Sequence, residues 1–286
     1  IQDPTVEKSH FGAKRLPLRM RGAGYWDIRC WRNVSLWCEH QPVVTTGHGR
    51  GIVNRYTASV PDAPSEVLAF DVYGTLVDPL RLDESLAPLI GDTAQPVTAL
   101  WRQKQLEFTF RLVAMERYED FASVTRKALA YALAVNGHTL DAEQVSAVLA
   151  RYDALPAYPD VLSGLTRLQR AGVPMVVCSN GTPAMLSALL QHTRLGDFFQ
   201  AVISVDTVGT YKPSPRVYRH IAERMGRALT EIRLVSANPF DVIGAREAGL
   251  QAAWINRSGA VFDPLGAPPD LIAPGVSALA DVLITK

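Results

Sequence analysis

Short apolar runs that end in a polar residue or a glycine turn recur along most of the chain. Five of them occupy residues 67–70, 174–178, 201–204, 232–235 and 251–255. Apolar runs of this length between turn signals are typical of strands that are buried on both faces of a sheet. Amphipathic stretches separate several of them, at residues 159–171, 214–226 and 239–249. This alternation predicts an α/β fold with a doubly wound parallel sheet, that is, a Rossmann-like core.

The alternation stops between residues 83 and 157, directly after the first expected strand. Three stretches there have a helical pattern of apolar positions and few helix breakers, near residues 97–115, 118–136 and 141–153. A helical block inserted at this point predicts a cap domain over the strand ends. We therefore expect a core formed by residues 66–82 and 158–286, with a helical cap at 83–157.

The first 65 residues differ from the rest of the chain. They hold nine Lys or Arg residues against five Asp or Glu, whereas the formal net charge of the whole chain is only +1. They show no sustained periodicity and end in a proline-rich polar stretch at 60–66, which is typical of a linker. We expect residues 1–65 to form a poorly ordered N-terminal extension.

Two functional interpretations of the extension are weaker. Cys30, Cys38, His40 and His48 could supply zinc ligands, but the segment has no CxxC or HxxxH pair of the kind that structural zinc sites use. Its nine basic residues are spread over 65 positions and make no dense patch for a nucleic acid. We expect neither a metal nor a nucleic acid to bind the extension.

The composition excludes several classes of protein. Hydrophobic residues make up 48% of the chain and charged residues 20%, which is ordinary for a globular core. Three cysteines cannot form a disulfide framework, and this favours a reducing compartment. No apolar run approaches the roughly 18 residues that a membrane span needs, and no signal peptide is visible. We expect a cytoplasmic protein that binds neither nucleic acid nor membrane.

Polar residues follow the expected strands at the points where ligands bind in such sheets. Ligands of doubly wound folds lie outside the carboxyl ends of the strands, and these ends present Asp71, Ser179, Lys212 and the segment 236–241. Each residue alone could be a turn former or a helix cap. Their joint occurrence predicts a site in which Asp71 is a carboxylate nucleophile that forms an ester, which water later opens.

Four ordered motifs resemble those of the haloacid dehalogenase-like hydrolase superfamily. The first is Asp71-Val-Tyr-Gly-Thr-Leu-Val, and the others are Ser179-Asn-Gly, Tyr211-Lys-Pro and Ser236-Ala-Asn-Pro-Phe-Asp241. The stretches that begin at Trp101 and Arg117 are similar to the cap of the L-2-haloacid dehalogenases. The resemblance covers about residues 66–286. It implies hydrolysis of a small-molecule L-2-haloalkanoic acid to the D-2-hydroxy acid through a covalent aspartyl ester.

The resemblance implies catalytic roles for nine residues: Asp71, Thr75, Arg102, Ser179, Lys212, Tyr218, Ser236, Asn238 and Asp241. Lys212, at a neighbouring strand end, would stabilise the ionised carboxylate of the nucleophile Asp71 by Coulomb attraction. Arg102 would meet the departing halide. Thr75 would donate a hydrogen bond to Asp71, and Asn238 and Asp241 would position or activate the hydrolytic water.

The resemblance also implies a substrate-binding set: Tyr73, Arg102, Leu106, Phe121, Ser179, Asn180 and Phe240. Ser179 and Asn180 would bind the substrate carboxylate, and the three apolar residues would line its alkyl group. Leu106, Phe121 and Tyr218 could equally well be ordinary core residues. Arg102 could also be a solvent-facing arginine on the surface of a helix. Phe240 replaces the tryptophan that is usual in the family, so the resemblance does not determine which length of substrate alkyl chain is preferred.

Two other functions are left open. A magnesium-dependent phosphatase of the same superfamily would carry an aspartate where this chain has Tyr73, and the fourth motif offers only one carboxylate, Asp241. Magnesium needs several oxygen ligands, and these motifs supply few carboxylates, so we expect a site with no metal and no cofactor. The missing acid is no obstacle to dehalogenation, because a halide leaves without a proton. The second alternative is a non-catalytic binding protein that uses the basic extension. Because relatives are often dimers, the resemblance also implies a homodimer.

Overall fold

A six-stranded parallel sheet forms the centre of the computed structural model, which describes residues 66–285. The strand order is β3-β2-β1-β4-β5-β6. The bounds are β1 (Val67–Phe70), β2 (Met175–Ser179), β3 (Ala201–Ser204), β4 (Ile232–Ser236), β5 (Gln251–Ile255) and β6 (Leu271–Ala273). All four residues of the central strand β1 are buried, as its continuous apolar sequence predicts. The interpretations of residues 1–65, including the zinc and nucleic-acid alternatives, lie outside the described residues.

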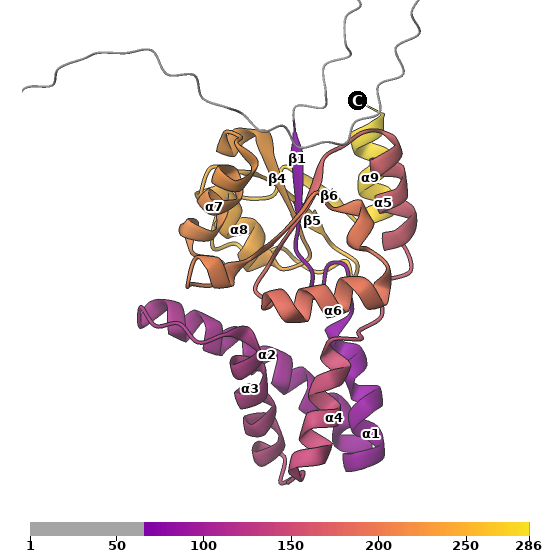
Figure 1. Cartoon of the computed structure of the whole chain (residues 1–286), viewed down its shortest axis with the longest axis vertical. Coiled ribbons are helices and arrows are strands. Elements are labelled where there is room, and N and C mark those ends of the chain that lie inside the picture. The colour runs from indigo at the N-terminus through magenta and orange to yellow at the C-terminus, as the bar shows by residue number, and fades with distance from the viewer. Residues whose placement is uncertain (1–65, 286) are drawn as a thin grey trace, which may run out of the picture. The chain divides into compact units, whose positions relative to one another are not determined.

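Helices cover both faces of the sheet. Figure 1 shows α5 (Val161–Arg170) and α9 (Val276–Ile284) on one side, and α7 (Pro215–Met225) and α8 (Pro239–Glu247) on the other. Gly164 lets α5 approach α9 closely, because a Cβ at this position would lie 2.7 Å from the backbone of Ser277. The doubly wound α/β fold class is confirmed.

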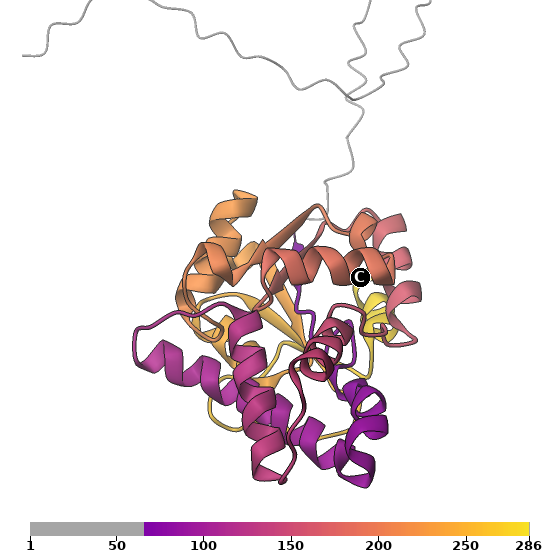
Figure 2. The same cartoon turned by 60° about the horizontal axis from the view of Figure 1, so that its bottom comes forward.

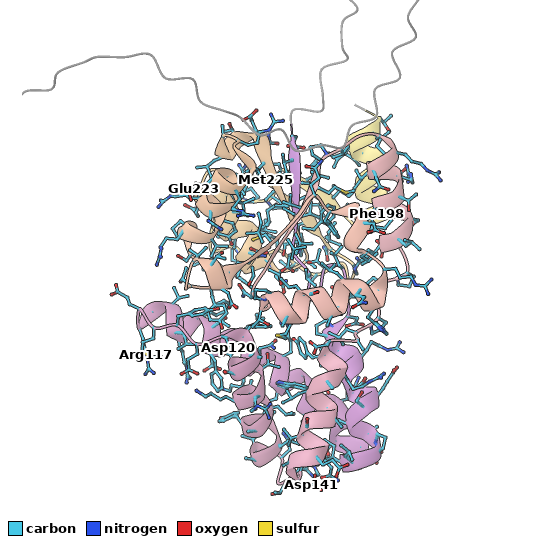
Figure 3. The ribbon with its side chains drawn as sticks, in the orientation of Figure 1. Arg117, Asp120, Asp141, Phe198, Glu223 and Met225 are labelled. Carbon is cyan, nitrogen blue, oxygen red and sulfur yellow. The ribbon has the colours of Figure 1, made fainter. Side chains whose placement is uncertain are left out.

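Four helices are inserted between β1 and α5. They are α1 (Asp83–Ile90), α2 (Ala94–Ala114), α3 (Phe121–Val135) and α4 (Ala142–Tyr152). Figures 1 and 2 show this helical block beyond the end of the sheet at which β1 finishes. Asp120 and Asp141 start α3 and α4 by accepting hydrogen bonds from the backbone N–H groups of Ser123 and Gln144; Figure 3 shows these two caps at opposite ends of the block. The inserted helical cap is part of the confirmed fold class.

Several elements differ from the sequence-based expectations. The helix expected near 97–115 spans residues 94–114, and α1, which contains Pro88, was not expected. The strand β6 has only three residues, one of them 60% exposed, and therefore lacks a continuous apolar run. Within the described part of the chain, no helix is long and apolar enough to cross a membrane.

Candidate active site

Asp71 lies directly after β1, in a tight turn that holds its carboxylate at the end of the sheet. The turn needs Gly74, whose φ of +93° is in the left-handed region. Asp71 is only 6% exposed. Its Oδ2 accepts hydrogen bonds from Thr75 Oγ1 at 2.8 Å and from Asn238 Nδ2 at 2.9 Å, while its Oδ1 accepts one from Lys212 Nζ at 3.1 Å. One carboxylate oxygen therefore receives two donors and the other receives one.

Lys212 lies in the loop that follows β3. The expectation that it comes from a strand next to β1 is wrong, because β2 lies between β3 and β1. The buried side chain reaches past the end of β2, where Nζ donates to the carbonyl of Cys178 at 2.7 Å. The same Nζ donates to Asp241 Oδ2 at 2.8 Å, in addition to its bond to Asp71. The three donors of the ammonium group thus have three partners, two of which are carboxylates.

The charge balance of this cluster shifts the pKa of Lys212 upward. Burial alone would lower the pKa, because it penalises the charged form. The carboxylates of Asp241 and Asp71 outweigh this effect and raise the pKa above its ordinary value of 10.5. Lys212 is therefore a permanent cation between two carboxylates at neutral pH.

Asp241 is buried in the first turn of α8. Burial raises the pKa of its carboxyl, Lys212 opposes this rise, and the Asp71 carboxylate adds to it. Tyr218, on α7, donates its hydroxyl to Asp241 Oδ1 at 2.8 Å, so this tyrosine contacts the site as well as the core. Asn238 begins the same helix, and its backbone N–H donates to Ser236 Oγ at 3.1 Å.

The end of β2 presents two side-chain donors that have no acceptor among residues 66–285. Ser179 Oγ accepts the backbone N–H of Gly181 at 3.2 Å, which leaves its hydroxyl hydrogen available to a ligand. Asn180 Oδ1 accepts the backbone N–H of Lys212 at 3.2 Å, so its amide NH₂ points away from that bond. These two donors suit the carboxylate of a small anion.

The helical cap reaches the Asp71 turn through Arg102 on α2. Its Nη2 donates to the carbonyl oxygen of Tyr73 at 3.2 Å, and its Nη1 donates to Gln105 Oε1 at 2.7 Å. The ring of Tyr73 packs on those of Phe121 and Tyr152, with centroid separations of 5.7 and 5.0 Å. Among residues 66–285, the buried hydroxyl of Tyr73 has no hydrogen-bond partner. It is an unsatisfied donor beside the nucleophile turn.

The expected apolar wall is only partly assembled around Asp71. Phe121 is 1% exposed and packs against Tyr73. Leu106 is one turn beyond Arg102 on α2 and is half-buried. Phe240, at the start of α8, instead contacts Phe110 of α2, with ring centroids 5.0 Å apart in an edge-to-face arrangement. Phe240 therefore links the core to the cap.

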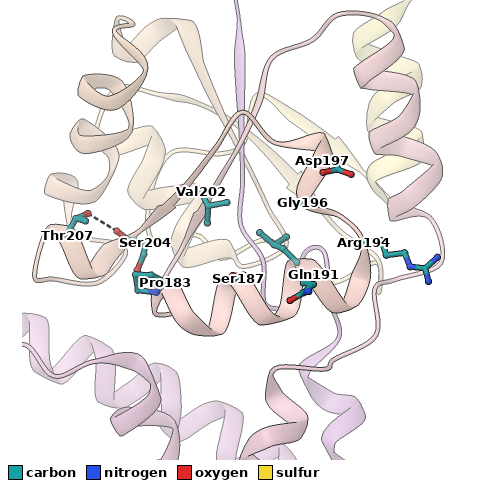
Figure 4. Close-up of a pocket in the computed structure, with 10 residues that line it drawn as sticks. Pro183, Ser187, Gln191, Arg194, Gly196, Asp197, Val202, Ser204 and Thr207 are labelled. Atoms are coloured by element: carbon teal, nitrogen blue, oxygen red, sulfur yellow. Dashed lines mark hydrogen bonds between the residues drawn. The ribbon is translucent and has the colours of Figure 1, made fainter. Parts of the chain in front are cut away.

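A separate cavity of about 750 Å³ lies between α6 (Pro183–Thr193) and the edge strand β3 (Figure 4). Its lining includes Leu190, Arg194, Val202 and Thr207. None of the predicted site residues lines it. This cavity is therefore separate from the cluster around Asp71.

The two carboxylates of the cluster are paired with the ammonium group of Lys212. Within the part of the chain that the structure describes, no group of three or more His, Cys, Asp or Glu side chains is placed to hold a metal ion. Asp71 and Asp241 both accept hydrogen bonds from Lys212 instead. The expectation of a site without metal or cofactor stays a prediction.

Sequence reasoning did not identify several residues that contact the site. Gln105, Thr125 and Tyr152 form a buried polar group behind Arg102, and Phe110 meets Phe240. Gln105 follows Arg102 by three positions and so shares its helix face. Its spacing from Arg102 was the available signal, but this spacing does not show that the side chain is buried.

The fold and the cluster define a class of hydrolase, and comparison with known proteins agrees. Residues 66–249 match the haloacid dehalogenase-like hydrolase family, and the chain belongs to this family. It is 35% identical over 221 residues to (S)-2-haloacid dehalogenase H-109 of Pseudomonas putida, a match that covers 77% of this chain and 99% of that protein. It is 36% identical to the (S)-2-haloacid dehalogenase of Pseudomonas sp. (strain YL), over 76% of this chain and 94% of that protein.

A solved structure is similar over the same share of the chain. The L-2-haloacid dehalogenase of Xanthobacter autotrophicus, with chloropropionic acid covalently bound, has a TM-score of 0.72 and 33% identity. The match covers 76% of this chain and 98% of that chain. The predicted resemblance to L-2-haloacid dehalogenases is confirmed.

Proposed function

We propose that this protein hydrolyses L-2-haloalkanoic acids to D-2-hydroxy acids through an ester on Asp71, without a metal. The observation that carries the proposal is the Asp71 carboxylate itself, which is buried at a strand end and held by Thr75, Asn238 and Lys212. The similarity to (S)-2-haloacid dehalogenases supports the substrate class.

In the first step, Asp71 attacks the carbon that carries the halogen. Among the described residues, Oδ2 accepts two hydrogen bonds and Oδ1 accepts one, so Oδ1 keeps a lone pair for the new carbon–oxygen bond. The carbon–halogen bond breaks and the halide leaves with the electron pair. Attack from the side opposite the halide inverts the carbon, which converts an L acid into a D product. Arg102 binds the departing halide, while Ser179 and Asn180 bind the substrate carboxylate.

In the second step, water attacks the carbonyl carbon of the Asp71 ester. Asp241 accepts the proton of this water, and the upward shift of its pKa suits a group that takes up a proton. Asn238 positions the water, and Tyr218 and Lys212 orient Asp241. Cleavage between this carbon and the ester oxygen releases the alkoxide of the product, which takes the proton held by Asp241 and leaves as the hydroxy acid. Asp71 is regenerated as a carboxylate with one oxygen from water, and the second proton of the water goes to solvent.

The same residues argue against the phosphatase alternative. A phosphate ester needs a proton on its leaving alkoxide, whereas a halide does not. The side chain at the position of the usual acid is that of Tyr73, whose pKa is raised well above 10.0, chiefly by burial. Tyr73 is thus a poor acid and is suited to hydrogen bonding.

The cellular setting and the assembly belong to the same proposal. We infer a cytoplasmic location from the low cysteine count, and Cys178 is a free buried thiol. The homodimer rests on the resemblance alone.

A panel of 2-haloacids tests the proposal. The purified protein is incubated with L- and D-2-chloropropionate and with a phosphate monoester, each in excess EDTA and in added magnesium, and halide or phosphate release is measured. We expect chloride release from the L isomer only, at the same rate in EDTA and in magnesium. Phosphate release that depends on magnesium, with no halide release, would contradict the proposed function.

A further inference from the structure

A fully buried glutamine lies behind Arg102 in the cap. Gln105 is 0% exposed, on the face of α2 that packs against α3 and α4. Its Oε1 accepts hydrogen bonds from Arg102 Nη1 at 2.7 Å and from Tyr152 Oη at 2.9 Å. Its Nε2 donates to Thr125 Oγ1 at 2.6 Å. A buried amide is stable only when its polar atoms are paired in this way.

The backbone of α3 determines which way this amide faces. The carbonyl oxygen of Phe121 can only accept, and Thr125 Oγ1 donates to it at 2.6 Å. The Thr125 oxygen must therefore accept from Gln105, so the NH₂ end of the amide faces Thr125. The carbonyl end is then directed toward Arg102 and Tyr152, which are both donors. The hydrogen-bond chain thus fixes a single orientation of the Gln105 side chain.

This arrangement holds the guanidinium of Arg102 at two points. Gln105 holds Nη1 from within the cap, and the Tyr73 carbonyl holds Nη2 from the turn that carries Asp71. A guanidinium has five N–H donors, so Arg102 keeps donors for a ligand beyond these two bonds. An arginine that is held in place before substrate binds loses less side-chain entropy when it contacts the departing halide.

We propose that Gln105 is a positioning residue that fixes Arg102 for the halide-release step, with Thr125 setting the orientation of its amide. The inference rests on the proposed function, because it assigns Arg102 to the halide. It predicts that Gln105 acts through Arg102 and not through general packing of the cap. Loss of its hydrogen bonds should therefore slow formation of the Asp71 ester more than hydrolysis of that ester.

The first test is Gln105→Met, which keeps the length of the side chain and removes its strong acceptor and its donors. The matched control is Gln95→Met, because Gln95 is an exposed glutamine on the same helix. Chloride release from L-2-chloropropionate is followed in a single turnover with enzyme in excess, and hydrolysis of the ester is followed by rapid quench. We expect halide release to slow at least about tenfold in Gln105→Met, with little change in ester hydrolysis and no change in the control.

A double-mutant cycle separates positioning from packing. If Gln105 acts through Arg102, adding Gln105→Met to Arg102→Ala should slow halide release no further. Tyr152→Phe keeps the hydrogen bond between Gln105 and Arg102 and should lose much less activity than Gln105→Met. Equal losses in Tyr152→Phe and Gln105→Met, or full additivity with Arg102→Ala, would overturn the inference.

Thr125→Val provides a second route if Gln105→Met does not fold. This near-isosteric change removes the group that orients the amide, and it should give a smaller loss that also vanishes in the Arg102→Ala background. A loss in Thr125→Val that persists in that background would overturn the inference. The wild-type protein separates the two hypotheses: absence of halide release from wild type contradicts the proposed function, whereas active wild type with unchanged variants contradicts only the role of Gln105.

Discussion

At the scale of single residues, one buried ammonium group links the two carboxylates of the proposed mechanism. Lys212 donates to Asp71 and to Asp241, and both bonds lie in a region with almost no solvent exposure. Removing one partner of such a cluster leaves an uncompensated buried charge, which typically destabilises a protein by about 3–5 kcal/mol. Lys212 therefore matters for folding as well as for chemistry.

The pKa of Asp241 leads to a prediction about pH. Asp241 must be ionised to accept a proton from water, and the hydrogen bond from Tyr218 lowers its pKa. Tyr218→Phe removes this bond, so Asp241 takes up a proton at a higher pH than in wild type. The acid limb of ester hydrolysis, measured by rapid quench across pH, should move to higher pH. Tyr131→Phe changes an exposed tyrosine and serves as the control; an unmoved acid limb in Tyr218→Phe would argue against Asp241 as the base.

The sequence predicts the location of some site residues but not of others. Asp71 and Ser179 follow apolar strands, and the parallel direction of those strands brings their ends to one edge of the sheet. Gln105 could not be placed in this way, because a glutamine on a helix is ordinarily exposed. Its burial depends on Thr125 and Tyr152, which lie 20 and 47 residues away in the chain.

At the scale of elements, the cap contacts the core at several points around the site. The loop before α3 contributes the carbonyl of Glu119, which accepts a hydrogen bond from Tyr211 at 2.5 Å. Arg102 of α2 contacts the Asp71 turn, and Phe110 of the same helix contacts Phe240 of α8. The site thus depends on how α2 lies against the carboxyl end of the sheet.

The Phe110–Phe240 contact predicts a limit on substrate size. We expect Phe110→Ala to enlarge the space between α2 and α8, and so to favour a longer alkyl group. The ratio of kcat/KM for L-2-chlorobutanoate to that for L-2-chloropropionate should rise by about tenfold, the value of one methylene group in an apolar pocket. Leu265→Ala, at a residue that is 84% exposed, is the control. An unchanged ratio in Phe110→Ala would show that this aromatic pair does not line the substrate pocket.

The elements with regular patterns were predictable and the irregular ones were not. The strand at 251–255 was predicted with its observed bounds, because its apolar run is continuous. The path of Lys212 was not predictable, since it depends on the strand order, and β2 separates β3 from the central strand. The helix α1 contains Pro88, which sequence rules treat as a breaker, although in the structure Pro88 is exposed within the helix.

At the scale of the whole molecule, the described residues contain every group of the proposed mechanism. The family match begins at residue 66, and the proline-rich boundary precedes it. A protein that begins at Ser65 should therefore be soluble and should release halide with the specific activity of the full chain. Both proteins are assayed side by side with L-2-chloropropionate. Aggregation or inactivity of the shorter protein would show that residues before Ser65 are needed for folding or for the site.

The covalent ester on Asp71 is the central claim, and oxygen labelling tests it most directly. With enzyme in excess over L-2-chloropropionate in ¹⁸O-labelled water, the first turnover transfers an unlabelled oxygen of Asp71 to the product. Water then attacks the ester carbonyl and leaves its oxygen on Asp71. Mass spectrometry should find unlabelled 2-hydroxypropionate and one ¹⁸O in the peptide that contains Asp71. Labelled product after one turnover, with no label in that peptide, would mean that water attacks the substrate directly and that Asp71 is not the nucleophile.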